Sequence, residues 1–94
     1  MRKIEEKMQR MNALATQIID ISVQSAQPTN GNLKYRVSIQ RQQRYTKNAL
    51  ISELMTLIAE CRRMSLNQTD KASLDASITR LNNKLYQATS LTIL

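Results

Sequence analysis

The side chains that most often perform catalysis are scarce in this sequence. Its 94 residues include seven acidic residues, one cysteine and no histidine. Without histidine the chain lacks the side chain that ordinarily exchanges protons near neutral pH. Glu53 and Glu60 lie seven residues apart on one face of an expected helix, where we interpret them as solvated surface residues. We therefore predict a protein that is not an enzyme and has no catalytic residue.

Cys61 is the only cysteine of the chain. It lies between Leu57 and Met64 at helical spacing, where a free thiol usually fills a small apolar space in the core. Arg62 and Arg63 would lower its pKa if they came close, but on a helix they project from other faces. A single cysteine without histidine also excludes zinc-finger sites, and no phosphate-binding loop or cofactor motif is present. We expect no metal and no cofactor.

Basic residues supply the clearest candidate binding site. The chain carries 14 Lys and Arg against 7 Asp and Glu, a formal charge of +7. No acidic residue occurs between Asp20 and Glu53. The basic residues of this interval are Lys34, Arg36, Arg41, Arg44 and Lys47. On a helix they would form a strip able to bind the phosphates of DNA or RNA, helped by Arg62 and Arg63, with Tyr45 available for stacking. A merely solvated face explains the same strip.

The elements that carry these residues follow from apolar periodicity. In the first segment the apolar residues recur at steps of three and four, which predicts a helix over about 2–24. Pro28 and Gly31 are the only proline and glycine and predict a turn at 27–32. A second helix is predicted from 33 or 41 to about 66, on a stripe that includes Leu50, Leu54 and Leu57.

A β-hairpin is the alternative for residues 19–40. The segments 19–24 and 33–40 both alternate apolar and polar residues, which is the period of a strand, and Asn30-Gly31 is a common hairpin corner. Pro28 close to the corner and the marginal stability of an isolated hairpin argue against this reading. The helical interpretation is the one we favour.

A third helix is predicted over about 71–92, after a polar linker at 67–70 in which Thr69 or Asp70 would cap it. Its apolar residues form a heptad stripe, as in a short coiled coil. The stripe and the apolar chain end give a candidate partner interface. Its residues are Leu81, Leu85, Leu91, Ile93 and Leu94. An intramolecular core explains the same stripe.

Together these patterns predict one all-α domain over residues 1–94. We expect a small three-helix bundle, or a long helical hairpin with a third heptad-patterned helix, as a monomer or a dimer. No signal peptide or membrane span is recognisable, so we expect a soluble, cytoplasmic protein for which a membrane is an unlikely partner. The predicted function is a helical protein-protein interaction module, such as an assembly factor, chaperone, adaptor or regulatory subunit. The alternative is a nucleic-acid-binding accessory protein that uses the basic 34–47 segment.

Overall fold

The computed structural model describes residues 2–26 and 33–90; at positions 25–26 and 33–36 it describes the helical backbone alone. The described residues form three helices, α1 (Lys3–Ala26), α2 (Leu33–Arg63) and α3 (Gln68–Thr89), and no strand. The predicted all-α fold is confirmed. The predicted turn at 27–32 lies outside the described residues.

The hairpin alternative for residues 19–40 is wrong in both of its strands. Residues 19–24 belong to α1 and residues 33–40 to α2. The alternation arises because the end of α1 carries apolar residues on several faces. Ile18 is buried, Ile19 and Ile21 are half-buried, and Val23 is exposed. Over six residues, such a helix end matches a strand period by coincidence.

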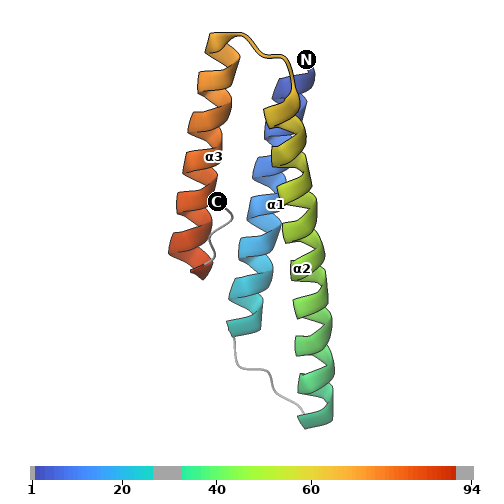
Figure 1. Ribbon diagram of the computed structural model, residues 1–94. Helices are drawn as coiled ribbons and strands as arrows, with labels where there is room; N and C mark the ends of the chain where they lie inside the picture. The colour runs from blue at the N-terminus through green and yellow to red at the C-terminus, as the bar shows by residue number, and fades with distance from the viewer. Residues whose placement is uncertain (1, 27–32, 91–94) are drawn as a thin grey trace.

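Helix α1 is the centre of the fold. It lies between α2 and α3 in Figure 1, and it packs against both, whereas α2 and α3 contact each other much less. The short connection after α2 returns the chain so that α3 runs antiparallel to α2 and parallel to α1. The molecule is elongated, with extents of 55 × 22 × 20 Å.

One apolar core joins the three helices. α1 contributes a stripe at steps of three and four, α2 contributes residues from its C-terminal half, and α3 contributes four residues of its heptad stripe. The buried residues are Ile4, Met11, Leu14, Ala15, Ile18, Leu54, Ile58, Cys61, Leu74, Ile78, Leu81 and Leu85. Ala88, the next residue of the predicted stripe, is exposed, and Thr92 lies outside the described residues.

Two ion pairs connect α1 to α2 beside this core. Lys7 Nζ lies 3.0 Å from Glu60 Oε2, and an Arg10 terminal nitrogen lies 2.8 Å from Glu53 Oε1. Glu53 and Glu60 were interpreted as solvated positions; both are partly exposed, but each also binds a basic residue of α1. Exposed pairs of this kind contribute at most about 1 kcal/mol each. They lie beside the buried stripe of α2 and are consistent with the side of α2 that this stripe turns toward the core.

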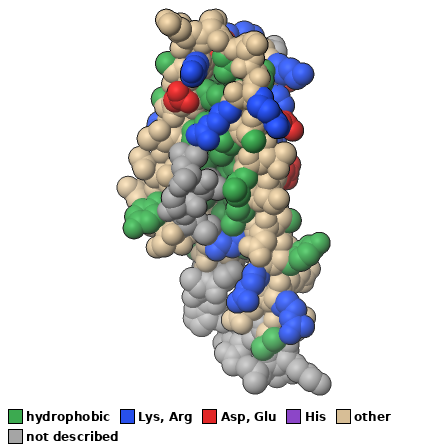
Figure 2. All heavy atoms as spheres, in the orientation of Figure 1, with side chains coloured by type: hydrophobic (Ala, Val, Ile, Leu, Met, Phe, Trp, Pro, Cys, Tyr) green, Lys and Arg blue, Asp and Glu red, His purple; other side chains and the backbone are tan. Residues whose placement is uncertain are grey.

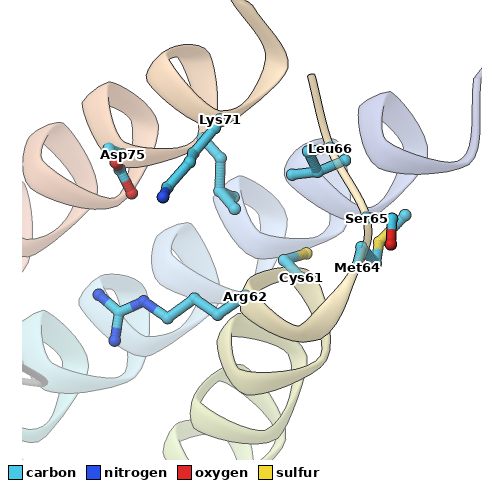
Figure 3. Close-up of a pocket in the computed structure, with 8 residues that line it drawn as sticks. Cys61, Arg62, Met64, Ser65, Leu66, Lys71 and Asp75 are labelled. Atoms are coloured by element: carbon cyan, nitrogen blue, oxygen red, sulfur yellow. The ribbon is translucent and has the colours of Figure 1, made fainter. Parts of the chain in front are cut away.

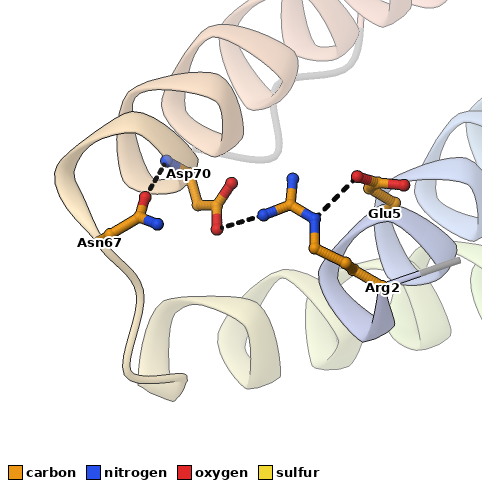
Figure 4. Close-up of polar contacts among 4 residues, drawn as sticks. All are labelled: Arg2, Glu5, Asn67 and Asp70. Carbon is orange, nitrogen blue, oxygen red and sulfur yellow. Dashed lines mark hydrogen bonds and ion pairs between the residues drawn. The ribbon is translucent and has the colours of Figure 1, made fainter.

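The start of α3 is fixed by Asn67 (Figure 4). Its side-chain oxygen accepts a 2.7 Å hydrogen bond from the backbone N–H of Asp70, so Asn67 is the N-cap, and not Thr69 or Asp70 as predicted. The Asp70 carboxylate instead accepts a 2.8 Å bond from Arg2, which also binds Glu5. Hydrogen bonds to Glu5 and then Asp70 raise the pKa of Arg2. The N-terminus of α1 is thereby tied to the start of α3.

The ends of α2 and α3 also differ from the predictions. α2 ends at Arg63 instead of about 66, and α3 runs from Gln68 to Thr89 instead of about 71–92. Ser90 terminates α3 in the left-handed conformation, with φ of 60°, and its N–H donates to the Tyr86 carbonyl at 2.8 Å. This C-terminal cap ends the helix before the heptad pattern ends. Apolar periodicity gives no signal of such a cap.

The helices differ in length, and this leaves one end of the molecule with two helices instead of three. At 1.5 Å per residue, α2 is about 46 Å long and α3 about 33 Å. All three helices have an end near the α2–α3 connection, so α3 stops first at the opposite end, and α1 and then α2 continue beyond it (Figure 1). We call this part, residues 19–26 of α1 and 33–47 of α2, the two-helix end.

Candidate functional site

The predicted polyanion-binding residues all belong to the N-terminal half of α2, within the two-helix end. Arg41 and Arg44 are exposed and Lys47 is half-buried. The side chains of Lys34 and Arg36 lie outside the described residues, although their backbone is helical. In Figure 2, Lys and Arg side chains lie on this part of α2, beyond the end of α3. Tyr45, the predicted stacking residue, is 78% exposed.

The charge of α2 is one-sided. Its only acidic residues are Glu53 and Glu60, and both are paired with α1. The other side carries a row of exposed basic residues, which we call the basic flank: Arg41, Arg44, Arg62 and Arg63. Arg62 follows Arg44 by 18 residues, five full helical turns, so both lie on one face. Among the described residues, none of these four forms an ion pair with an acidic side chain.

The residues of the predicted apolar interface fall into two groups, those that are buried in the core and those outside the described residues. Leu81 and Leu85 are 3% and 1% exposed because they pack in the core that α3 shares with α1. They are therefore covered within the chain, as the intramolecular reading expected. Leu91, Ile93 and Leu94 lie outside the described residues, so an interface at the chain end stays a prediction.

Two aliphatic side chains are exposed at the two-helix end, whereas the exposed Met55 and Tyr86 lie elsewhere on α2 and α3. Val23 of α1 is 49% exposed and Val37 of α2 is 43% exposed. Ile19, Ile21 and Ile39 beside them are half-buried. None of these residues was among the binding residues predicted from the sequence. The available signal was the run of apolar residues at 19, 21 and 23, which lie outside the narrow stripe that one core needs.

A small hollow lies between the end of α2 and the start of α3 (Figure 3). Its volume is about 270 Å³ and its lining includes Cys61, Arg62, Lys71 and Asp75. Figure 3 shows Arg62 and Lys71 extending toward the same side of the hollow, with Asp75 beside Lys71. This volume lies below the usual range for small-molecule sites, about 300–1,000 Å³. The hollow is therefore a shallow charged surface with two cations and one carboxylate, and it is too small for a typical ligand pocket.

Cys61 is a core residue, as predicted. It is fully buried, and its thiol lies 3.9 Å from the Met11 sulfur. Burial, the main cause, raises the pKa of the thiol, and Glu60 raises it further, while Lys7 acts in the opposite direction. A buried thiol with a raised pKa forms little thiolate near neutral pH, and the thiolate is the reactive form. Its surroundings favour packing over redox or nucleophilic chemistry.

Comparisons with protein-family models, with curated proteins and with solved structures found no match to this chain. No described helix combines the length and the apolar character that crossing a membrane requires.

Proposed function

We propose that this protein is a helical protein-protein interaction module that binds its partner at the two-helix end. The observation that carries the proposal is the early end of α3 at Thr89, beyond which α1 and α2 continue with no third helix among the described residues. A helix pair with half-buried and exposed apolar side chains gains stability when another helix covers them.

The burial pattern supports this location over the heptad stripe of α3. Four residues of the stripe, Leu74, Ile78, Leu81 and Leu85, are buried in the core, so truncating them would destabilise the fold before it tested an interface. Val23 and Val37, in contrast, are exposed on neighbouring helices at the same end of the molecule. Apolar side chains left exposed where no third described helix packs are candidates for contact with a partner.

Site-specific photo-crosslinking in the producing cell tests the proposal. A photoreactive residue at position 23 or 37 is expected to crosslink one protein partner, whereas the same residue at position 55 is not. Met55 is a matched control because it is 51% exposed on α2, outside the two-helix end. The purified partner should then bind the wild-type chain and lose at least tenfold in affinity for the Val23→Gln, Val37→Gln variant. Retention of full affinity by a folded variant would refute the assignment to this end.

Nucleic-acid binding is the second candidate function, and the one-sided charge of α2 favours it. The basic flank offers exposed guanidinium groups along one face, with both acidic residues of α2 paired elsewhere. If five basic residues each neutralised a phosphate, the logarithm of the affinity would fall with a slope of roughly −4.5 against the logarithm of salt concentration.

Anisotropy titrations with labelled single- and double-stranded DNA and RNA distinguish the two functions. The nucleic-acid reading predicts submicromolar binding at physiological salt that is lost when Arg41, Arg44 and Lys47 are replaced by Gln. It also predicts no effect of Val23→Gln, because a surface valine contributes little to phosphate binding. Weak binding that disappears at physiological salt would leave the protein-interaction proposal standing alone.

A further inference from the structure

α3 lies along one side of α1 and α2, and we call this side the path of α3. The path continues along α1 and α2 beyond the point at which α3 ends. On α1, the side that meets α3 is marked by Met8, whose sulfur accepts a 3.7 Å hydrogen bond from Ser77, and by Asn12, which lines a hollow with Arg80. On α2, it is marked by Arg62, which lines the hollow with Lys71. Both faces extend by helical periodicity into the two-helix end, where no described residue covers them.

The α1 side of this continued path is apolar. Ala15, Ile19 and Ser22 follow Met8 and Asn12 at alternating steps of three and four, which keeps them on the face that meets α3. Val23 lies beside them, four residues after Ile19. Ile19 is half-buried and packs against the core, level with the last turn of α3 in the register that pairs Met8 with Ser77. Beyond that turn this face presents the small Ser22 and then Val23, which is 49% exposed.

The α2 side of the same path changes from apolar to basic. Level with α3, α2 carries Ile58, which is part of the shared core, and Ile51, which packs against it; both lie on the same helical face as Arg62 by their spacing. Arg44 lies seven residues before Ile51, and Lys47 lies four before it, so these two basic residues occupy the same face beyond α3. Lys47 is half-buried and Arg44 is exposed, and neither is paired with an acidic side chain among the described residues.

No described acidic side chain is placed to neutralise this basic side. Asp20 is the only acidic residue of the described two-helix end. It follows Ile19 directly, so it projects about 100° away from Ile19 around α1, although it neighbours Val23 at three residues' spacing. Glu53, the next acidic residue along α2, is bound to Arg10. A helix lying on this path would thus touch apolar side chains on one side and two uncompensated cations on the other.

From this pairing of one apolar side with one basic side, we infer that the occupant is an amphipathic helix of a partner protein with acidic residues beside its apolar stripe. The inference rests on the proposed function and specifies the chemistry of the partner. An apolar stripe would cover Ile19 and Val23, while carboxylates would bind Arg44 and Lys47. A second copy of this chain fits less well, because it brings another formal +7 to the contact.

Synthetic helical peptides of about 18 residues, long enough to form helix in isolation, provide the probe. Three peptides share one leucine heptad stripe and differ only in the flanking residues, which are Glu, Gln or Lys. In anisotropy titrations at physiological salt, we expect the Glu peptide to bind the wild-type protein at least tenfold more tightly than the Gln peptide. The Arg44→Gln, Lys47→Gln variant should lose this preference and keep its affinity for the Gln peptide.

The matched control is Arg80→Gln, Lys84→Gln, which removes the same charge from the exposed surface of α3. It should retain the preference for the Glu peptide within about twofold. The Arg44→Glu, Lys47→Glu variant should reverse the preference toward the Lys peptide. Far-ultraviolet circular dichroism of each variant should match that of the wild type.

Other results would overturn the inference. An equal loss in the control variant would show that the peptides respond to net charge alone. Equal binding of the Glu and Gln peptides, abolished by Val23→Gln, would refute the acidic partner while leaving helix binding at this end intact. A dimer that dissociates with Val23→Gln would assign the path to a second copy. A gain in affinity for both peptides on removal of residues 91–94 would assign it to the chain's own end. If neither peptide binds, the inference fails, and the crosslinking experiment decides the proposed function independently.

Discussion

At the residue scale, Cys61 links the core to a measurable pH dependence. Burial raises the pKa of its thiol, so the folded state disfavours the thiolate that the unfolded chain forms above its ordinary pKa of about 8.5. The resulting stability is present in full below that value and is lost as the pH rises above it. We expect the free energy of unfolding of the wild type, relative to Cys61→Ala, to decrease between about pH 8 and 10. Urea denaturation under reducing conditions measures this difference, and parallel curves would contradict it.

At the element scale, Asn67 decides where α3 begins. Asn67→Ala removes the acceptor of the Asp70 N–H and should cost about 1 kcal/mol, whereas Asn67→Ser should retain most of that contribution. Thr69→Ala is the informative control, because the sequence offered Thr69 as a cap and the structure places it inside the helix. Urea denaturation of the three variants ranks them. A larger loss for Thr69→Ala than for Asn67→Ala would show that the cap is assigned wrongly.

At the scale of the whole molecule, stability depends on the contacts that α2 and α3 make with α1. Leu85→Ala should cost about 2–5 kcal/mol, because Leu85 is buried between α3 and α1. Tyr86→Ala, one residue away and 59% exposed, should change stability by less than about 0.5 kcal/mol. Denaturant midpoints measure both. Similar losses for the two variants would mean that the chain end or a second molecule covers Tyr86 in solution.

Much of this protein could be predicted from the sequence because the signals are local. Steps of three and four between apolar residues predicted three helices, and the spacing around Cys61 predicted a core thiol. The ends of α2 and α3 could not be predicted from that signal. They depend on which polar side chain reaches which backbone N–H, and several neighbouring residues could serve equally well.

The candidate site, too, could be predicted from the sequence only in part. The interval from Asp20 to Glu53 contains no acidic residue, so the basic segment could be predicted from the sequence alone. That Glu53 and Glu60 both turn toward α1, leaving the opposite side of α2 basic, depends on how two distant segments pack. The exposed Val23 and Val37 also depend on tertiary structure, because a residue's exposure at a helix end depends on where the neighbouring helix stops.

By itself, then, the sequence determined the helical class, the core stripes and the excess of positive charge, because each is a property of residue type and short-range spacing. Only the tertiary structure decided that α1 is the central helix and that α3 ends before the other two. The physical reason is that local spacing fixes which face of a helix is apolar. The relative lengths and packing of the helices fix which part of that face remains uncovered.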